Sequence, residues 1–519
     1  MPIAVVALVL GILSLSALPA TAAPAGFEFF EPVVPPRAFQ VMVHRGMARQ
    51  APENTRAAID MCSADGLEWV EVDVRLSKDG RHVLFHDGTL DGKSNGTGTV
   101  KEHTLAELKE LDAGGWFAKR FAAAKLLTLE ECFALVKGKI NLYLDCKDID
   151  PALLVKEIQA AGVERQVIVF DKPAVLRRVR ELSGGTIGVM PKWHPADGFG
   201  KWLDELQPAA VEIDADETTP AICREFHARG IKVQAKVLGE WDNPKFWDKV
   251  LSDGVDYLQT DLPEEIIAHV MDRQLKPRPV RLACHRGASR YAPENTLPAF
   301  EKAHRLHADF IEFDVRPSHD GKFFLLHDKQ LNRTTTGKGA INDAGSDTIV
   351  ALDAGKWFGR PFVGTRVPSL DEFLSAVPEG MSLYFDAKDI PPEALAAALE
   401  KHGLTARTIV YQGAGYLEKL KQIDARIRAL PGAGSADQVT ALAASLKPYA
   451  VDTPWPVLSK KYIDHCHAAG IQVFADAPFT VDIKGYRQAI EWGIDAIQTD
   501  YPLRVWRAME LVAAERAQR

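Results

Sequence analysis

The sequence predicts an α/β protein of two tandem TIM-type (β/α)8 barrels, each with an insertion after its second strand. Three observations lead to this prediction. One set of motifs occurs twice, strand-like and helix-like segments alternate along both halves, and each half approaches the roughly 250 residues typical of such a barrel. Alternation of strands and helices is typical of a parallel sheet, and about eight strands per half favour a closed barrel over an open sheet.

The repeated motifs keep a constant spacing. The series His-Arg-Gly, Pro-Glu-Asn-Thr, Glu-x-Asp and His-Asp runs from residue 44 to 87 and returns from residue 285 to 328. Its members are separated by a step of 241 residues, as between His44 and His285 or between Glu71 and Glu312. A register held over this length indicates a duplicated domain.

The N-terminus has the pattern of a secretory signal. Residues 3–18 are nearly all apolar, and Ala20-Thr-Ala22 offers small residues for cleavage. The apolar run is shorter than the roughly 20 residues of a membrane span. A signal peptide at residues 1–23 is therefore expected, with a secreted or periplasmic location. No Lys or Arg precedes the run, so an uncleaved membrane anchor is the alternative.

The first barrel is expected at residues 39–272, after a linker rich in Pro and aromatic residues at 26–39. Helical patterns such as 53–64, 151–161 and 174–182 separate the strands. Strands are expected near 39–43, 67–74, 140–144, 166–170, 186–190, 209–213, 231–235 and 257–259. Residues 88–127, with a Gly-rich stretch and Trp116-Phe117, break the alternation and are expected to project as the insertion.

The second barrel is expected at residues 280–515, after a polar, Pro-containing linker at 272–279. Its first three strands are expected at 281–284, 310–315 and 383–385. Its insertion includes residues 332–339 and Trp357-Phe358. The two halves end alike, in Gln-Thr-Asp261 and Gln-Thr-Asp500.

Composition narrows the function classes. The 62 Lys and Arg against 70 Asp and Glu give a net charge of −8, so nothing favours nucleic-acid binding. An anionic substrate must then be held by local cations or a metal. The six cysteines lack metal-binding spacing and are expected to be buried thiols, although one disulfide would be compatible with an oxidising compartment.

Carboxylates gather at predicted strand ends. Residues i and i+2 of a strand face the same way, so Glu71 and Asp73 share a face, and Asp145 ends the next strand at the same rim. Three such carboxylates suit Ca²⁺ or Mg²⁺. Solvated strand ends with ordinary salt bridges are the alternative, but the trio recurs as Glu312, Asp314 and Asp386.

Histidines and cations accompany each trio. His44 and His86, and again His285 and His327, lie at strand ends and could exchange protons as acid and base. Asp87 and Asp328 follow the second histidine and either orient a neighbour or start a turn. Arg45 and Arg286 suit phosphate contact. Lys147 and Lys388 either bind phosphate or balance the carboxylates.

Together these residues resemble the glycerophosphodiester phosphodiesterase family. The resemblance rests on His-Arg-Gly, Pro-Glu-Asn-Thr, Glu-x-Asp, His-Asp, a carboxylate-x-Lys and a late Thr-Asp, and it covers both halves. It implies a TIM-type barrel, a divalent metal that is often Ca²⁺ or Mg²⁺, and hydrolysis of glycerophosphodiesters to glycerol 3-phosphate and an alcohol. It also implies that the histidine pairs act as general acid and base, with attack by a neighbouring hydroxyl of the substrate.

The sequence departs from the family pattern in three places. Both halves have Asp, not Glu, before x-Lys, so the third ligand could bind through water. The second half keeps Leu-x-Arg-Thr-Thr-x-Gly at 331–337, with Arg333, whereas the first half has Lys93 but no such Arg at 90–96. The seventh strands end differently, at 234–237 and 474–477, which leaves the alcohol open.

Two other functions stay open at the level of sequence. One is action on intact lipid, phospholipase D-like or phosphoinositide-like, if Trp116-Phe117 and Trp357-Phe358 form an apolar rim and are not packed inside the insertions. The other is a binding role for one or both barrels. The expected partner is a small phosphodiester; membrane contact is compatible but not required, and the sequence does not set the oligomeric state.

Overall fold

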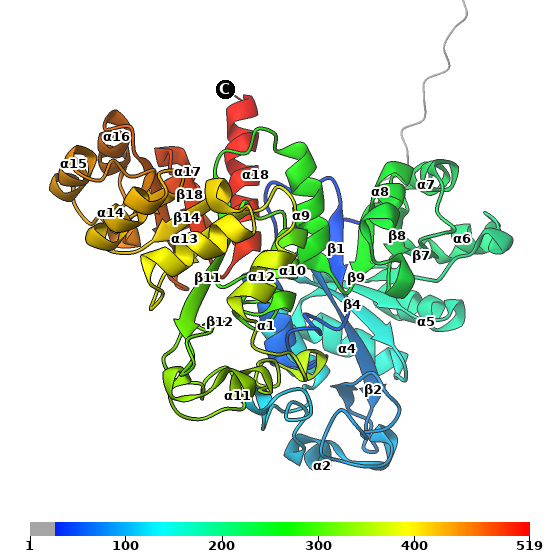
Figure 1. Cartoon of the computed structure of the whole chain (residues 1–519). Helices are drawn as coiled ribbons and strands as arrows, with labels where there is room; N and C mark the ends of the chain where they lie inside the picture. Colours follow the sequence, from blue (N-terminus) through cyan, green and yellow to red (C-terminus); the bar gives the residue numbers. More distant parts are fainter. Residues whose placement is uncertain (1–25, 519) are drawn as a thin grey trace, which may run out of the picture.

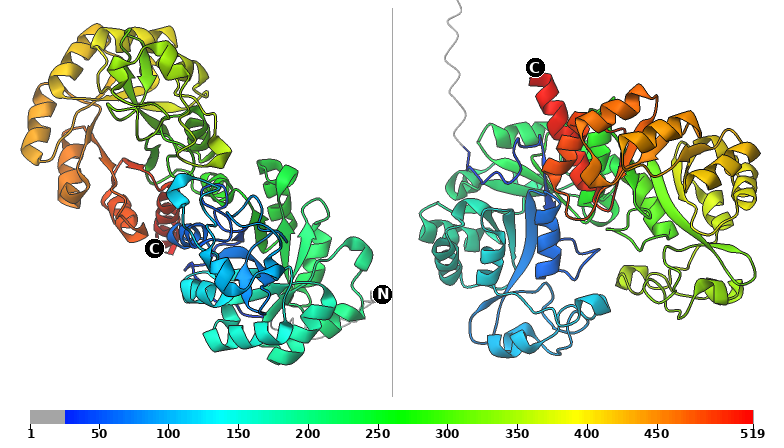
Figure 2. Two further views of the ribbon diagram at one scale, coloured as in Figure 1. Left: turned by 90° about the horizontal axis from the view of Figure 1, so that it is seen from below. Right: turned by 90° about the vertical axis from the view of Figure 1, so that its left-hand side faces the viewer.

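The chain forms two (β/α)8 barrels, one in each half, that lie side by side (Figures 1 and 2). The computed structural model describes residues 26–518, so the predicted signal peptide lies outside the described residues. The predicted fold class is confirmed.

The first barrel has eight parallel strands in the order β6-β5-β4-β2-β1-β9-β8-β7. Between β6 and β7 a parallel bridge joins Lys192 to Glu212, and the Ala209 amide donates to Val189 O at 2.9 Å, which closes the barrel. The strands are β1 (Gln40–Val43), β2 (Trp69–Leu76), β4 (Asn141–Cys146), β5 (Val167–Phe170), β6 (Gly188–Met190), β7 (Ala210–Asp214), β8 (Lys232–Lys236) and β9 (Tyr257–Thr260).

The second barrel repeats this order as β15-β14-β13-β11-β10-β18-β17-β16. Its closing bridge joins Gly432 to Asp452. The strands are β10 (Arg281–Cys284), β11 (Phe310–Pro317), β13 (Ser382–Asp386), β14 (Thr408–Tyr411), β15 (Arg428–Leu430), β16 (Ala450–Asp452), β17 (Gln472–Asp476) and β18 (Ala496–Thr499).

Helices follow the strands and cover each barrel. Many begin at a capping side chain or a proline, as at Asp150, and several end at a left-handed glycine such as Gly162, as local sequence favours. In barrel 1 they are α1 (Arg56–Ala64), α3 (Leu129–Val136), α4 (Pro151–Ala161), α5 (Pro173–Ser183), α6 (Lys201–Leu206), α7 (Pro220–His227), α8 (Pro244–Asp253) and α9 (Pro263–Gln274). In barrel 2 they are α10 (Leu297–Arg305), α12 (Leu370–Ala376), α13 (Pro392–Lys401), α14 (Ala414–Ile423), α15 (Ala436–Ala444), α16 (Lys460–Ala468), α17 (Ile483–Trp492) and α18 (Pro502–Gln518).

Alternate strand residues fill the inside of each barrel. One buried cluster contains Met42, Trp69 and Tyr143, and its counterpart contains Ala283, Phe310 and Tyr384. Side chains alternate between the two faces of a strand, so residues two positions further along also point inward, at the carboxyl ends of the strands. The carboxylates and first histidines of the predicted sites occupy these positions.

Each insertion begins with a hairpin. Strand β3 (His82–Leu84) pairs antiparallel with β2, and β12 (Phe323–Leu325) with β11. The insertions then carry the short helices α2 (Leu105–Glu110) and α11 (Ser346–Val350), which project from the same side of the molecule in Figure 1.

The aromatic pairs of the two insertions are packed. Phe117 and Phe358 are buried, and the Arg360 amide donates to Phe117 O at 2.8 Å. The guanidinium of Arg120 lies over Phe358 and Trp357, 4.4 and 5.8 Å from the ring centroids. The pairs therefore join the insertions to each other, which favours packing over an apolar rim for lipid.

The interpretation of residues 26–39 as a linker is wrong. Phe29 packs edge-on against Trp69 at 4.9 Å, and Asn141 donates to Phe30 O at 2.8 Å, so the segment covers the amino-terminal end of barrel 1. The buried Arg37 then pairs with Glu68 of barrel 1 and Glu510 of barrel 2. Aromatic residues in this segment serve the core, which their composition alone did not distinguish from a tether.

Equivalent elements of the two halves meet at the interface. Helix α9 packs against α18, and each follows the last strand of its barrel (Figure 1). The 272–279 segment is not wholly a linker, because α9 extends to Gln274.

Two further findings concern the cysteines and the possibility of a membrane-spanning helix. All six cysteines are buried and free. Among the residues that the structure describes, no helix has the length and apolar character needed to cross a membrane.

Candidate active sites

An acidic trio lies at the carboxyl end of each barrel. Ligand oxygens of Glu71, Asp73 and Asp145 come within 4.8 Å of one another, and the second trio repeats this geometry. In barrel 1, Glu71 Oε1 is buried and has no hydrogen-bond partner among the described residues, whereas the buried Asp73 Oδ1 forms an ion pair with Lys147 Nζ at 3.3 Å. Buried carboxylate oxygens without donors fit a cation, because an unpaired buried anion is costly. The second trio is Glu312, Asp314 and Asp386.

Burial and crowding perturb these carboxyl groups. Burial and the charge of Asp73 raise the pKa of Glu71 well above its usual range, and burial with Asp314 does the same to the pKa of Glu312. Burial also raises the pKa of Asp145 and of Asp386. Such repulsion is what a bound divalent cation would relieve.

The turn after the first strand positions histidine and arginine. Arg45 has a left-handed backbone (φ 57°), and its amide donates to Glu71 Oε2 at 2.6 Å. Gly46 lets the turn approach α1, because a Cβ there would lie 2.8 Å from that of Ala58. Barrel 2 repeats both features at Arg286 (φ 54°) and Gly287.

The first histidine of each barrel is held by the late aspartate. His44 Nδ1 lies 2.8 Å from Asp261 Oδ1, and His285 Nδ1 lies 2.9 Å from Asp500 Oδ1. Arg45 Nε lies 3.1 Å from His44 Nε2, so Nδ1 carries the proton shared with Asp261 and Nε2 accepts.

The first histidines and their aspartates perturb each other. Burial lowers the pKa of His285, but the hydrogen bond to Asp500 and the charges of Glu312 and Asp476 outweigh it and raise the pKa to about 9. Burial likewise works against the shift at Asp261 and Asp500, where the bound histidine holds the pKa below its usual range.

The second histidine of each barrel is also paired. His86 Nδ1 lies 2.7 Å from Asp87 Oδ1, and His327 Nδ1 lies 2.8 Å from Asp328 Oδ1. These aspartates therefore orient the histidine, which resolves the alternative of a simple turn residue. The charge of His327 reaches Asp386, which places this histidine beside the second trio.

The difference expected between Arg333 and Lys93 is smaller than the sequence suggests. Arg333 bridges Asp328 and Glu294 at 2.7 Å. Lys93 lies 2.8 Å from Glu53 and 3.7 Å from Asp87. Barrel 1 thus retains a cation, Lys93, one position later in the loop than the 241-residue step from Arg333 predicts.

Lys147 and Lys388 each contact two carboxylates of their trio. Lys147 Nζ lies 2.6 Å from Asp145 and 3.3 Å from Asp73. Lys388 pairs with Asp386 and lies 3.3 Å from Asp314. In this arrangement both lysines balance charge.

Several supporting residues escaped the sequence prediction. The Asn54 side chain donates to Asp73 Oδ2 at 2.7 Å and accepts a hydrogen bond from the backbone amide of Asp73 at 2.9 Å. Asn295 makes the same two hydrogen bonds with Asp314. Glu53 and Glu294 hold Arg45 and Arg286. All four belong to the repeated Pro-Glu-Asn-Thr motif, and that repetition was the available signal.

The wall opposite each trio differs between the barrels. In barrel 1, Lys192 contacts Glu212 at 3.2 Å and Asp214 at 2.5 Å, and Glu212 accepts from the Tyr143 hydroxyl at 2.8 Å. His194, Asp214 and Glu217 form a further group of possible ligands there.

Barrel 2 has no counterpart of this lysine, because Gly432 stands in its place at the closing bridge. Burial and the charges of Asp476 and Asp386 raise the pKa of Asp452 to about 7. The opposite wall of barrel 2 therefore lacks the lysine that pairs with the equivalent carboxylate, Glu212, in barrel 1.

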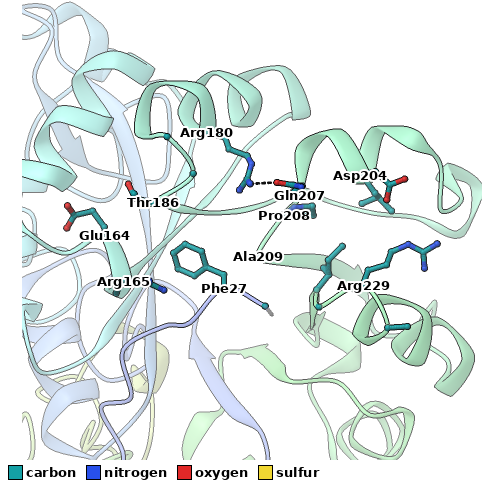
Figure 3. A pocket seen from close by; sticks show the side chains of 17 residues that line it. Phe27, Glu164, Arg165, Arg180, Thr186, Asp204, Gln207, Pro208, Ala209 and Arg229 are labelled. Atoms are coloured by element: carbon teal, nitrogen blue, oxygen red, sulfur yellow. Dashed lines mark hydrogen bonds between the residues drawn. The ribbon is translucent and has the colours of Figure 1, made fainter. Parts of the chain in front are cut away.

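A hollow of about 900 Å³ opens at the other end of barrel 1 (Figure 3). It lies beside Phe27, Arg180 and Gln207, where strands β7 and β8 begin. The acidic trio lies at the carboxyl ends of the strands, so this hollow is not part of the candidate site.

Comparison with known proteins gives two matches along the chain. The model of the "Glycerophosphoryl diester phosphodiesterase family" matches residues 44–265 and 285–504. A glycerophosphodiester phosphodiesterase of Bacillus subtilis is 30% identical over 254 residues, 44% of this chain and 86% of the relative. One from Caldanaerobacter subterraneus is 32% identical over 244 residues, 44% of this chain and 96% of the relative.

Solved structures also match a single barrel. The crystal structure of a glycerophosphodiester phosphodiesterase from Agrobacterium tumefaciens is 28% identical, with a TM-score of 0.41, and the match covers 44% of this chain and 99% of that one.

Proposed function

Because the chain belongs to the glycerophosphoryl diester phosphodiesterase family, whose members hydrolyse phosphodiester bonds, we propose that both barrels hydrolyse glycerophosphodiesters to glycerol 3-phosphate and an alcohol. One observation carries the proposal for both halves. Each barrel holds two histidines, each backed by an aspartate, around an acidic trio.

A divalent metal, Ca²⁺ or Mg²⁺, is proposed as the cofactor of each barrel. Oxygen ligands from Glu71, Asp73 and Asp145 would hold it in barrel 1, and the corresponding trio would do so in barrel 2. When bound, the cation supplies positive charge to the phosphate oxygens. The buried Glu71 Oε1, which has no hydrogen-bond partner among the described residues, supports this assignment.

The histidines would perform the two proton transfers. A glycerol hydroxyl next to the phosphoester attacks phosphorus, and one histidine accepts its proton while the P–O bond to the alcohol breaks. The other histidine donates a proton to the departing oxygen. Water then opens the cyclic phosphate with the roles reversed, which gives glycerol 3-phosphate.

Carboxylates prepare each histidine for this role. With Nδ1–H donated to Asp261, the Nε2 atom of His44 is the basic nitrogen on the substrate side. Asp87 orients His86 in the same way. Arg45, held by Glu53 and 3.6 Å from Asp73, is placed for contact with the phosphate.

Release of glycerol 3-phosphate from glycerophosphocholine with added Ca²⁺ or Mg²⁺ tests the proposal. The variants are His44→Ala, His285→Ala and the double variant. Activity should fall in each single variant and be lost in the double one. His227→Ala and His467→Ala are matched controls, because these histidines also pair with aspartates in both halves but lie near the opposite strand ends.

Three outcomes would contradict parts of the proposal. Unchanged activity in the double variant would exclude the histidine mechanism. Loss in only one single variant, with glycerophosphocholine and with glycerophosphoglycerol alike, would make the other barrel a non-catalytic binding module. Detergent-dependent activity on intact lipid, with none on deacylated diesters, would favour the lipid substrate.

A secreted or periplasmic location is proposed from residues 1–23 alone. Expression of the full chain with and without these residues, followed by fractionation, tests it. Retention of the full-length protein with the membrane would favour the uncleaved anchor.

A further inference from the structure

The inward-facing residues opposite the trios carry different charges in the two barrels. Lys236 ends strand β8 in barrel 1, and Asp476 ends the equivalent strand β17 in barrel 2. Both continue the barrel-lining alternation, since Asp476 follows Phe474 of the interior cluster by two positions. At the same step of 240 residues, barrel 2 has Gly432 where barrel 1 has Lys192, and Asp452 where barrel 1 has Glu212. Barrel 2 thus lacks both lysines of this wall, and it has Asp476 where barrel 1 has Lys236 but Pro454 where barrel 1 has Asp214.

This acidic wall faces the reacting groups. Asp476 is close enough to His285 for their charges to act on each other. The charges of Asp476 and Asp386 likewise act on Asp452. A substrate whose phosphate lies between His285 and the trio would therefore place its alcohol within reach of Asp476 and Asp452.

A buried acceptor on this wall points to a ligand. Asp452 Oδ1 has no hydrogen-bond partner among the described residues, whereas its counterpart Glu212 in barrel 1 accepts from Lys192 and from Tyr143. Gln498 Oε1 is also without a partner, but so is the equivalent Gln259 Oε1 of barrel 1, so this amide does not distinguish the barrels. Lys192 is the cation that satisfies the equivalent Glu212 in barrel 1, so in barrel 2 a positive group is missing from the protein itself.

Two aromatic residues belong to the elements that carry the acidic wall. Tyr411 faces the interior with Tyr384, and Phe479, three residues after Asp476, is 71% exposed on the following loop. Barrel 1 has Gly239 at the position of Phe479. Carboxylates together with aromatic faces bind organic ammonium groups through charge and cation–π attraction.

A second metal ion fits this wall less well. In the described part of the chain, the groups of His, Asp and Glu side chains with ligand atoms within 4.8 Å of one another do not include Asp452 and Asp476. We therefore take an organic cation as the better occupant of this wall.

We propose that barrel 2 prefers diesters whose alcohol carries a positive charge, choline or ethanolamine, whereas barrel 1 prefers a neutral or anionic alcohol. The proposal rests on the proposed function of the same sites. Asp476, Asp452 and Phe479 select the alcohol in barrel 2, and Lys236 and Lys192 disfavour a cation in barrel 1. The two barrels thereby divide a mixed pool of deacylated phospholipids.

The test uses the full chain with one barrel silenced at a time. His44→Ala leaves barrel 2 active, and His285→Ala leaves barrel 1 active. The measurement is kcat/KM for glycerophosphocholine relative to glycerophosphoglycerol, which carries a neutral alcohol. We expect this ratio to be about tenfold higher for barrel 2, the size of one well-placed charge interaction at a partly exposed site.

Charge-swap variants give the sharper result. Asp476→Asn should lower the ratio for barrel 2 by about tenfold, and Lys236→Asp should raise it for barrel 1. Because Asp476 also acts on His285, a change shared by both diesters reports on the histidine, and only the ratio reports on the alcohol.

The outcomes separate the two claims. Equal ratios in the two single-barrel enzymes, or an Asp476→Asn variant with an unchanged ratio, would overturn the division of substrates and leave the hydrolysis intact. No hydrolysis of either diester by either enzyme would overturn the proposed function itself.

Discussion

Each histidine of the two sites has its Nδ1 atom against an aspartate. The first histidine of each barrel reaches far along the chain, from His44 to Asp261 and from His285 to Asp500, whereas the second uses its neighbour. The distant partner is the residue that follows the last strand, and this strand pairs directly with the first. Closure of the barrel therefore completes the proton-transfer group.

Replacing the distant aspartate should reduce turnover more than binding. In Asp261→Asn the amide either donates to Nδ1 or accepts more weakly, so His44 loses the tautomer that leaves Nε2 basic. With barrel 2 silenced by His285→Ala, we expect kcat to fall about 100-fold with little change in KM. Steady-state kinetics on glycerophosphoglycerol, whose alcohol is neutral, measures both constants; a rise in KM alone would contradict this role.

The acidic trios should link metal binding to pH and stability. Burial and the neighbouring aspartate raise the pKa of Glu71 and of Glu312 well above 4.5 in the folded chain, so folding takes up protons at any pH between the unfolded and the folded pKa. The stability contributed by their protonated forms is present at low pH and is lost as pH rises through the raised values. A bound cation would remove the repulsion that causes the loss.

We therefore expect Ca²⁺ or Mg²⁺ to raise Tm more at about pH 8 than at about pH 5, by about 5 °C at saturation. Thermal unfolding in chelator and in metal, at both pH values, measures the difference. The double variant Glu71→Gln with Glu312→Gln is the control and should show little metal effect. A metal-induced shift that is the same at both pH values would argue against the trios as the binding sites.

Residue types were predictable where chemistry repeats, and their partners were not. The histidines, arginines and acids follow from the 241-residue step. Lys93 was underestimated because it reaches Glu53 from a neighbouring position, which only the loop's path reveals. Lys236 and Asp476 stood out as departures from the family pattern, but their opposite charges gained meaning only once both were seen to line a barrel.

At the scale of elements, the turn from β1 to α1 sets the site. Gly46 has φ 75°, and an added Cβ would meet the Cβ and carbonyl carbon of Ala58 at 2.8 and 2.9 Å. Since the neighbouring residues are His44 and Arg45, any shift of this turn moves both away from Glu71.

Gly46→Ala should therefore destabilise barrel 1 and reduce its activity. Gly80→Ala is the matched control, because Gly80 has a similar φ of 70° but no atom within 4 Å of an added Cβ. We expect Gly46→Ala to cost about 2 kcal/mol more than Gly80→Ala, the effect of overpacking beyond that of backbone strain. Denaturant unfolding of the two variants measures this difference, and equal losses would mean that the turn yields without strain.

Elements with strong periodicity were predictable, and elements that depend on distant contacts were not. In β2 the apolar Val70, Val72 and Val74 alternate with Glu71 and Asp73, a period-two pattern that the sequence reports directly. The segment at 26–39 looks like a tether because it lacks periodicity, yet Phe29 fills the barrel end against Trp69. Its role is set by a partner in the barrel and not by its own pattern.

At the scale of the whole molecule, the barrels pair like two subunits but not identically. Helices α9 and α18 meet as equivalents, and so do the aromatic pairs of the insertions. Asp65, at the end of α1, is an exception. It is 1% exposed and lies 2.9 Å from Arg290 in the loop after His285, whereas the equivalent position in barrel 2 is Leu306.

This ion pair ties barrel 1 to the site of barrel 2. Arg290 lies over the ring of Tyr501, 4.7 Å from its centroid, and the neighbouring Ser289 donates to Asp500 at 2.8 Å. Asp500 in turn holds His285. Removal of the carboxylate leaves a buried guanidinium uncompensated, which costs about 3 kcal/mol or more.

Asp65→Leu, which installs the residue found in the other half, should therefore impair barrel 2 selectively. In the His44→Ala background we expect kcat of barrel 2 to fall about tenfold, because the loop that carries His285 loses its anchor. In the His285→Ala background the activity of barrel 1 should change little, since the anchor lies on the other barrel's loop. Equal losses in both backgrounds would indicate general destabilisation, and no loss in either would show that the loop holds its geometry without the contact.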